Sequence, residues 1–435
     1  MKKYNNIIKI FFLILSMTLL FNLVIITLKG NSREAFIVND IKKNELEGSI
    51  TFISNRTDKR KELNLLIDEF EKIHPNVKIN LELIGDTEEI LRRKAVVGEL
   101  PDVTLVPTAI NFSEFNNYFL PLNDLGFNED NIYNYNLGVD GKLYDLTASI
   151  TWQGVIYNKK IFKEADIQEL PKNEKEFFDA CNKIKNIGLM PIALNYREKW
   201  SMNMWSDSIP YLFDPTLENN LVVKSKDILN DESSFYKSLE FARKIVQNGY
   251  CENDFLNYDW QQCKNDIKDE KIAMIILNSD FLYQLEDMGM SKDDISIFPI
   301  PDSKVITVDG DNKFAVSKNT KYPKLSKEFL KYLFENDRYS KAVNVMSALK
   351  NSEENIKMIK SLQEFNLPIV LQEQVLKNQT ISDTKIHDEY YNFRKITELD
   401  GNFTQKYVVS SDVENLKKDI NKKWKEYRNK AQSKK

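Results

Sequence analysis

Two apolar runs in this sequence end in clusters of side chains that can form hydrogen bonds. Residues 278–280, Asn-Ser-Asp, follow the apolar run 272–277, and residues 55–58, Asn-Arg-Thr-Asp, follow the strand-like run 48–54. Loops at strand ends lie on the surface, so each cluster could simply form a turn or a helix cap. Alternatively, several strands end around one crevice that holds a polar ligand. Arg56 could then grip hydroxyl or carboxylate groups with two parallel hydrogen bonds.

Other kinds of site chemistry find little support. The two histidines, His74 and His387, are far apart, which argues against a histidine-rich metal site and against a Ser-His-Asp triad. The three cysteines, Cys181, Cys251 and Cys263, form no CxxC motif. Cys251 and Cys263 could form a disulfide in an oxidising compartment, which the sequence alone leaves open. We therefore predict no metal ion and no cofactor.

The bulk composition is that of a folded protein with more than one domain. At 435 residues the chain is too long for one ordinary core, so two domains are expected. Hydrophobic residues make up 42% and charged residues 29%, which argues against disorder. The net charge is −4 and no basic stripe is present, which excludes nucleic acid as a partner.

The N-terminal segment predicts the location of the protein. Lysines within residues 1–9 precede residues 10–28, which are uncharged and long enough to cross a hydrocarbon core of about 30 Å. A secretory signal has a shorter apolar region and a small-residue cleavage site, and residues 29–36 show no clear one. We predict an uncleaved transmembrane anchor over 10–28, a tether over 29–47 and the remaining chain on the extracytoplasmic face of the cell membrane. Secretion after signal cleavage is the alternative.

The chain after residue 47 alternates strands and helices, and its first unit is β-α-β. Residues 48–55 are typical of a strand, and residues 59–74 have apolar side chains spaced by three and four, which predicts an amphipathic helix. Pro75 ends this helix, because proline disfavours helical backbone in the preceding residue. Residues 77–83 alternate as a second strand. Strand, helix and strand in close succession predict parallel pairing with a right-handed crossover.

The same alternation continues almost to residue 320, and the chain from residue 324 onward is predicted to be mostly helical. Further strands are expected at 101–107, near 144–157, and at 190–195, 272–277, 295–301 and 312–320. Further helices are expected at 87–98, 174–188, 233–249 and from residue 260, with another helical region around residues 200–205.

In this order, the segments resemble the extracellular solute-binding proteins of ABC importers, in particular the sugar-binding type, family 1. The stretch "LLIDEFEKIHPNVKINLEL" is similar to the first β-α-β unit of that group, and "GELPDVTLVP" to its second landmark. "GVIYNKKIFKEADI" resembles the segment in which the chain first changes lobe. The match is completed by "KIAMIILNSDFLYQL", "ISIFPIPD" and "FAVSKNTKYPKLSKEFLKYLF".

The resemblance implies a two-lobed α/β fold of the periplasmic-binding-protein type (type II), with mixed and parallel sheets flanked by helices. The implied N-lobe comprises residues 48–157 and 297–345, and the C-lobe residues 158–296 and 346–435. The lobes would close by a hinge on a carbohydrate or another small polar solute, the partner would be an ABC permease, and the protein would be a monomer. Independently, open α/β sheets bind ligands beyond the carboxyl ends of their strands, and closure of such a crevice excludes water.

Two features depart from the family pattern. Members often carry a tryptophan where Asp280 stands; a carboxylate cannot stack on a sugar ring, although it accepts hydrogen bonds from hydroxyl groups. This argues for a small or polar ligand. No cysteine lies near residues 10–28, so a lipid cannot be attached there. Either the anchor replaces the lipid, or the protein no longer serves in transport. The alternative function is therefore a membrane-anchored sensor that reports ligand to a partner membrane protein.

A sugar site needs aromatic faces for the C–H side of the ring and planar polar groups for the hydroxyls. Each tryptophan could equally be a core residue, and Trp200 and Trp205, five positions apart, are expected to have only one member facing the ligand. Trp260 is expected to pack. Asp102 could have a structural role instead. The predicted ligand-binding residues are Asn55, Arg56, Asp58, Asp102, Trp152, Trp200, Trp205, Asn278, Asp280 and Asn312.

An enzyme is the remaining alternative. Asp58 and Asp280 could form the carboxylate pair of a glycosidase. Such pairs lie about 5.5 Å or about 6.5–9.5 Å apart, and no sequence spacing shows that separation. We therefore predict a binding protein without catalytic residues.

Overall fold

The structure is a computed structural model of the chain, and it describes residues 46–85, 87–107, 110, 112–215, 225–371, 389–390 and 392–433. The predicted anchor over 10–28, the segment 1–9 and residues 29–45 of the predicted tether lie outside the described residues. Within the described ranges, no helix combines the length and the apolar character needed to span a bilayer.

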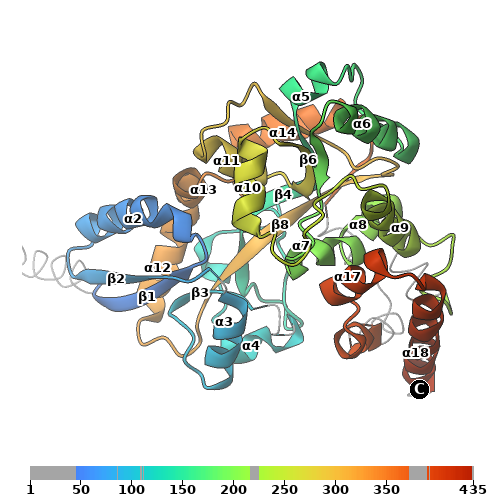
Figure 1. Cartoon of the computed structure of the whole chain (residues 1–435). Coiled ribbons are helices and arrows are strands. Elements are labelled where there is room, and N and C mark those ends of the chain that lie inside the picture. Colours follow the sequence, from blue (N-terminus) through green and yellow to red (C-terminus); the bar gives the residue numbers. More distant parts are fainter. Residues whose placement is uncertain are drawn as a thin grey trace, which may run out of the picture.

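Strands and helices alternate along most of the chain, which is an α/β architecture (Figure 1). The strands are β1 (Gly48–Ser54), β2 (Val77–Leu83), β3 (Val103–Leu105), β4 (Asp145–Asn158), β5 (Met190–Ala193), β6 (Ile272–Asn278), β7 (Ile295–Phe298), β8 (Ile306–Val316) and β9 (Ile369–Leu371). The first helices are α2 (Arg60–Ile73), α3 (Thr87–Val96), α4 (Phe115–Tyr118), α5 (Lys159–Glu164), α6 (Glu174–Asn186), α7 (Lys199–Asn203), α8 (Ile209–Phe213) and α9 (Ser234–Gln247). The later helices are α10 (Trp260–Lys268), α11 (Phe281–Asp287), α12 (Pro323–Phe334), α13 (Arg338–Val343), α14 (Glu353–Gln363), α17 (Gly401–Val409) and α18 (Val413–Ser433).

The described strands form one mixed sheet in the order β2-β1-β3-β8-β4-β6-β5, with β7 paired to β4 and β9 to β8. The predicted β-α-β unit is confirmed, because β1 and β2 pair in parallel with Gly48 opposite Val77. Helix α2 between them buries the predicted apolar stripe, including Leu63, Ile67 and Phe70. Burial of each such side chain contributes about 1.5–3 kcal/mol to stability.

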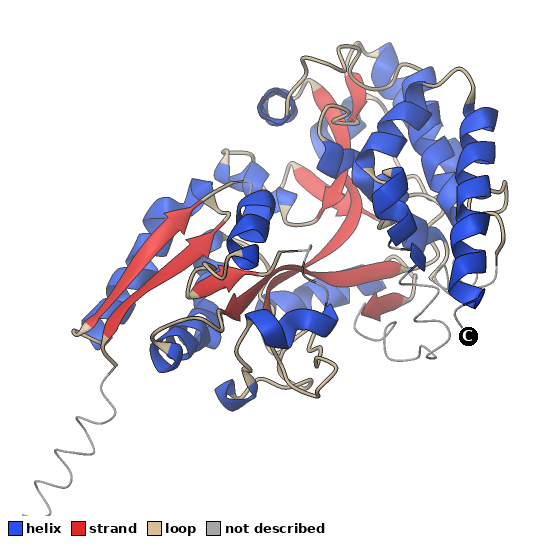
Figure 2. Ribbon diagram, turned by 90° about the horizontal axis from the view of Figure 1, so that it is seen from below, coloured by secondary structure: helices blue, strands red, loops and turns tan. Residues whose placement is uncertain are grey.

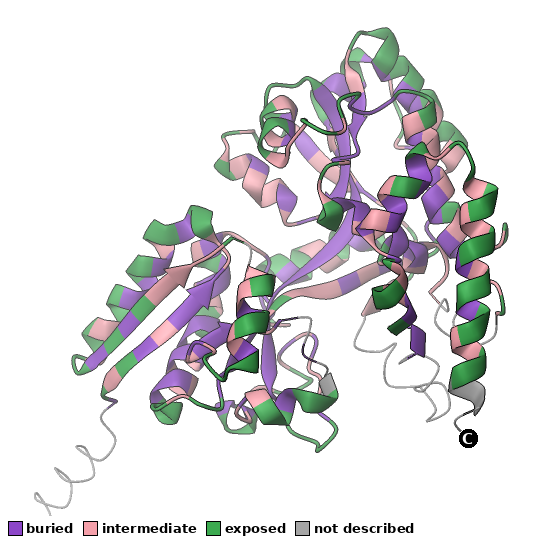
Figure 3. Cartoon of the chain, turned by 60° about the horizontal axis from the view of Figure 1, so that its bottom comes forward, coloured by how far each residue is buried: buried purple, intermediate pink, exposed green. Residues whose placement is uncertain are grey.

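Two large apolar clusters form the core, and β4 contributes to both. The first cluster contains Leu146 and Ala148 of β4 together with side chains of β1, β2, α2, α12 and α13. The second contains Val155 of β4 with side chains of α6, α9, α17 and α18. Figure 2 shows long strands running between the part that carries β1 and β2 and the part that is rich in helices. In Figure 3 the strands are mostly buried and the outer helix faces exposed.

Strand β8 begins earlier than the sequence predicts. A strand was expected at 312–320, whereas β8 covers Ile306–Val316. The polar residues 309–312, Asp-Gly-Asp-Asn, look like a turn, and Asn312 does have a positive φ of 49°. Asp309 and Asp311 nevertheless pair with β4, opposite the polar residues Thr151 and Ser149. The short strand β9 is not predicted by any pattern in the sequence.

Candidate functional site

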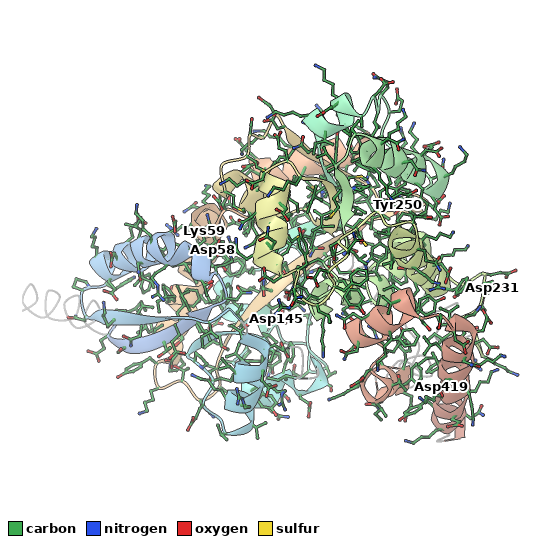
Figure 4. All side chains as sticks on the ribbon, in the orientation of Figure 1. Asp58, Lys59, Asp145, Asp231, Tyr250 and Asp419 are labelled. Carbon is green, nitrogen blue, oxygen red and sulfur yellow. The ribbon has the colours of Figure 1, made fainter. Side chains whose placement is uncertain are left out.

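One face of β4 is polar along its whole central part. The side chains on this face are buried, although none is apolar: Asp145, Thr147, Ser149, Thr151 and Gln153. The residues of β8 that lie directly opposite three of them are Lys313, Asp311 and Asp309. Directly opposed residues of an antiparallel pair have their side chains on the same face of the sheet. The paired strands therefore present a continuous polar surface between the two apolar clusters, and Figure 4 shows Asp145 at the centre of the molecule.

The polar cluster after β1 lies beside this surface. The guanidinium of Arg56 donates to both carboxylate oxygens of Asp58, over 3.0 Å from Nε and 2.8 Å from Nη2. Burial opposes ionisation of Arg56, but the hydrogen bonds and the charge of Asp58 prevail and raise its pKa. Asn55 donates from Nδ2 to Oδ1 of Asn312, over 3.1 Å, which joins this cluster to β8. The structure thus brings together four predicted residues.

Asp280 faces the same cluster from the start of α11. Burial and the neighbouring charge of Asp311 raise the pKa of Asp280 to about 7, while the charge of Arg56 acts in the opposite direction. Asp280 occupies the N-cap position of α11, yet its side chain forms no capping hydrogen bond. Its carboxylate accepts a hydrogen bond from Nε2 of Gln284, over 3.4 Å. The carboxylate therefore contacts one residue of its own helix and lies within reach of the charges of Arg56 and Asp311.

The residues before Asp280 connect β6 to the polar face of β4. Asn278 lies opposite Gln153 in the sheet. The hydroxyl of Ser279 lies 3.1 Å from that of Thr151 and accepts a hydrogen bond from the backbone N–H of Trp152. Part of the Asn-Ser-Asp cluster is therefore structural, and Asp280 is the member that extends beyond the sheet.

An ion pair lies next to this cluster. Nζ of Lys59 is 2.6 Å from Oδ2 of Asp287, at the C-terminal end of α11. A helix C-terminus favours a nearby cation, so this position suits the ammonium group. Asn344 also donates to Asp287, over 3.3 Å. Figure 4 shows Asp58 and Lys59 at the end of α2 nearest to α10. These contacts fix the segment after β1 against α11.

The three tryptophans predicted as ligand contacts have different surroundings. Trp152 lies on the apolar face of β4, opposite to Thr151, and packs with Ile150, Val308 and Met346. Trp205 is 2% exposed and stacks on Phe241 with ring centroids 5.9 Å apart. These two side chains are parts of the core.

Trp200 is 46% exposed and is the predicted tryptophan that remains available to a ligand. Its ring meets Trp260 edge-on at 5.3 Å, and Trp260 in turn packs against Phe281 at 5.1 Å. This row of rings runs from α7 over the start of α10 to the start of α11, next to Asp280. Trp260 packs, as expected, between the exposed ring of Trp200 and the buried ring of Phe281.

Asp102 has a structural environment. Its Oδ2 accepts the backbone N–H of Thr51 over 2.8 Å, and its Oδ1 accepts the hydroxyl of Thr320. The carboxylate thus ties β1 to the loop after β8, which is the alternative that the sequence left open.

The sequence interpretation missed the polar face itself, that is Thr151, Gln153, Asp309 and Asp311. The sequence does indicate the part of this face that lies on β4, because residues 145–153, "DLTASITWQ", alternate strictly between polar and apolar side chains. That alternation places Trp152 with Leu146 and Ile150, away from Thr151. The polar residues of β8 carry no comparable signal.

The cysteines form no disulfide. Cys181, Cys251 and Cys263 are all buried free thiols, and burial raises the pKa of each. The pairing of Cys251 with Cys263 that the sequence left open is therefore not present. Within the described residues, no group of His, Cys, Asp and Glu side chains is arranged to hold a metal ion.

Comparison with known proteins places this geometry in a family. The chain is 24% identical over 307 residues to the multiple sugar-binding protein of Streptococcus mutans, which covers 66% of this chain and 70% of that protein. The fold matches a manno-oligosaccharide-specific solute-binding protein of Bifidobacterium animalis subsp. lactis, solved with mannotriose, with a TM-score of 0.75, 24% identity and coverage of 90% and 96% of the two chains. It also matches the solute-binding protein RafE in complex with raffinose, with a TM-score of 0.67, 17% identity and coverage of 88% and 100%.

The model of one protein family matches residues 54–338, which begin at the last residue of β1 and include the whole polar face and α11. The predicted resemblance is thereby confirmed, and with it the prediction of a binding protein and not an enzyme. This chain belongs to the bacterial extracellular solute-binding proteins.

Proposed function

We propose that the protein captures a carbohydrate outside the cytoplasm and delivers it to an ABC importer. The observation that carries this proposal is the meeting of Arg56, Asp280 and the polar face of β4 at the ends of strands from both parts of the molecule. Binding of a hydroxyl-rich solute needs such convergent polar groups beside an aromatic surface. Trp200 and Trp260 supply that surface. Relatives that bind multiple sugars, manno-oligosaccharides and raffinose support the same ligand class.

The mechanism that we propose is closure of two lobes about the strands that join them. The proposed N-lobe comprises residues 48–157 and 297–345, and the proposed C-lobe residues 158–296 and 346–435. The two apolar clusters support this division, because each is centred on one proposed lobe and β4 passes between them. Closure would bring Trp200 of one lobe toward Arg56 of the other. Exclusion of water then strengthens each polar contact with the solute.

We further propose that residues 10–28 anchor the protein in the membrane, with the binding part outside and an ABC permease as its partner. The uncharged segment behind an N-terminal group of lysines supports this arrangement. Co-purification of the full-length protein with a permease supports the importer, whereas co-purification with a histidine kinase indicates the sensor.

A ligand screen tests the carbohydrate proposal. The full-length chain, purified in detergent, is heated with mannotriose, raffinose, glucosamine oligosaccharides, and amino acids as non-carbohydrate solutes. A solute that binds the folded state raises the melting temperature by mass action, and we expect this from at least one carbohydrate. A rise caused by amino acids alone would refute the ligand class.

Two matched arginine variants locate the site. Arg56 and Arg92 each hold a carboxylate with two hydrogen bonds, but Arg92 does so with Glu89 on the exposed face of α3. We expect Arg56→Gln to weaken binding of the selected carbohydrate at least tenfold and Arg92→Gln to leave the affinity unchanged. Equal affinities for both variants would place the ligand elsewhere.

A further inference from the structure

The charge balance at the proposed binding site is negative. Asp280 follows Ser279, whose hydroxyl lies 3.1 Å from that of Thr151, and Asp311 lies opposite Ser149, two positions from Thr151 on the same face of β4. The charge of Asp311 raises the pKa of Asp280, and the charge of Arg56 acts to lower the pKa of both carboxyl groups. The guanidinium of Arg56 is already bound by Asp58. Within the part of the chain that the structure describes, neither Asp280 nor Asp311 forms a salt bridge. Two carboxylates therefore share a site whose nearby cation is engaged.

Hydrogen bonds from the fold use only part of the acceptor capacity of these carboxylates. An aspartate at an N-cap normally accepts a backbone N–H of its helix, which contributes about 1 kcal/mol to stability. Asp280 forgoes this bond. Asp311 accepts from Nδ2 of its exposed neighbour Asn312 over 2.9 Å. Asp311 also accepts a backbone hydrogen bond from Asn312. A carboxylate has about four acceptor sites, so both groups keep acceptor capacity for a ligand.

A second, independent observation comes from the same face of β4. Thr147, two positions from the residue opposite Asp311, is 1% exposed, and its hydroxyl has no hydrogen-bond partner among the described residues. Buried polar groups are nearly always hydrogen-bonded in folded proteins, to protein, water or ligand. The polar face therefore has hydrogen-bonding capacity that the described chain leaves unused.

We propose that the natural ligand is a carbohydrate that bears a protonated amino group, and that this ammonium lies between Asp280 and Asp311. The inference rests on the proposed carbohydrate function and narrows its ligand class. An ammonium group has three donors and no acceptor, which complements carboxylates that only accept. The resulting hydrogen bonds are charge-assisted and stronger than those to a neutral hydroxyl. A neutral sugar leaves the repulsion between these two half-buried carboxylates uncompensated.

The raised pKa of Asp280 adds a second readout. Asp280 is faced by Asp311 from β8, by Arg56 from the segment after β1, and by Tyr283 and Gln284 from its own helix. With a pKa of about 7, the carboxyl of Asp280 is mostly protonated at pH 6 in the free protein. An ammonium beside it favours the carboxylate, so binding at pH 6 releases a proton. At pH 8 Asp280 is already ionised and releases no proton, whereas the sugar amine, which is partly neutral at this pH, takes up a proton when it binds as an ammonium.

Calorimetry with a matched pair of ligands tests the inference. A deacetylated glucosamine trisaccharide and its N-acetylated counterpart share one sugar backbone and differ in charge, and mannotriose serves as a neutral reference. Each is titrated into the full-length protein in detergent, at pH 6 and pH 8, in buffers that differ in ionisation enthalpy. We expect the amine to bind about tenfold to a hundredfold more tightly than the N-acetylated form, with proton release at pH 6.

Three variants assign the effect to the two carboxylates. Asp280→Asn and Asp311→Asn are expected to reduce this preference, and Asp280→Asn to abolish proton release. The control is Asp179→Asn, because the side chain of Asp179 is 59% exposed on α6 and its replacement changes the net charge by the same amount. We expect this variant to keep both the preference for the amine and the proton release. Melting curves of all variants confirm that they are folded.

The outcomes separate this inference from the proposed function. Equal or tighter binding of the N-acetylated sugar or of mannotriose would overturn the amine inference and leave the carbohydrate function intact. An amine preference that persists in Asp280→Asn and Asp311→Asn would overturn the assigned position. If no carbohydrate binds at either pH, the proposed function fails and the amine inference fails with it.

Discussion

At the scale of single residues, two tryptophans in one helical region have opposite surroundings. Trp205 is enclosed by the second apolar cluster and stacks on Phe241, whereas Trp200 is about half exposed beside Trp260. The same residue type therefore stabilises the fold at one position and remains available for a ligand at the other. Stability and affinity can be measured separately, so these roles can be distinguished.

We expect Trp205→Ala to lower the free energy of unfolding by about 3–5 kcal/mol, because it leaves a large cavity. Trp200→Ala should change stability by less than about 1 kcal/mol and weaken binding of the selected carbohydrate about tenfold, since stacking on the ring is lost. Urea unfolding and calorimetric titration of both variants measure the two quantities. Unchanged affinity in Trp200→Ala would remove the aromatic row from the binding site.

Asp280 also has a defined effect on stability. Its pKa of about 7 in the folded protein lies above the value of about 3.9 expected for an unfolded chain. Between these two values the folded state binds more protons than the unfolded state, so the free energy of unfolding falls as pH rises. Asp280→Asn removes this dependence. We expect the variant to gain on the order of 2 kcal/mol relative to the wild type between pH 4 and pH 8, measured by urea unfolding.

Asp58 provides a control of the opposite sign. The hydrogen bonds and charge of Arg56 outweigh burial and lower the pKa of Asp58. Its stabilising contribution is present above the unfolded pKa and is lost as pH falls through the folded value. Asp58→Asn should therefore lose stability at pH 8, and this loss should diminish as pH falls below the unfolded pKa of Asp58. Parallel pH profiles for the wild type and both variants would contradict these assignments.

The individual site residues were only partly predictable from the sequence. Asn55, Arg56 and Asp280 could be recognised because polar residues after an apolar strand are visible in the sequence itself. Their proximity could not, since it depends on β8 being inserted between strands that lie far from it in sequence. The burial of Trp205 was likewise invisible, because the residues around it are polar and its neighbour Phe241 lies in another helix.

At the scale of secondary-structure elements, a buried carboxylate organises the turn after β5. Glu252 accepts the backbone N–H groups of Leu194 and Tyr196, over 3.0 and 2.7 Å. Burial raises its pKa even though these hydrogen bonds favour the ionised form. The turn that Glu252 holds leads directly into α7, which carries Trp200. A change at Glu252 should therefore affect both stability and the aromatic row.

We expect Glu252→Gln to cost about 1–3 kcal/mol of stability, because its amide group brings a donor to a place where two N–H groups need an acceptor. Glu252→Ala should cost at least as much. Glu353→Gln, whose side chain is 89% exposed on α14, is the matched control and should stay within about 0.5 kcal/mol of the wild type. Urea unfolding measures all three. Equal stability of Glu252→Gln and the control would show that the turn does not need the carboxylate.

Elements with strong periodicity were predictable, and those that depend on a partner strand were not. The helix α2 and the strands β1 and β2 were expected and confirmed, since their apolar spacing is regular. The first half of β8 was missed, because its Asp-Gly-Asp-Asn segment looks like a turn unless the polar side chains of β4 are known to face it.

At the scale of the whole molecule, the proposed closure has a measurable consequence. Lobes that move together make the molecule more compact, so small-angle scattering of the full-length protein in matched-out detergent should show a smaller radius of gyration after addition of a saturating carbohydrate. The Arg56→Gln variant, at a ligand concentration too low to saturate it, should keep the larger radius of gyration of the ligand-free protein. An unchanged radius at full saturation of the wild type would show that binding occurs without closure.

The long strand β4 has a practical implication for attempts to divide this protein. Its first part pairs with β8 and its last part with β6 and β7. If the chain were divided anywhere within residues 145–158 and the two parts were expressed separately, each fragment would expose unpaired backbone and an uncovered apolar surface. Neither fragment is expected to remain soluble alone. Recombinant dissection of this chain must therefore leave β4 whole.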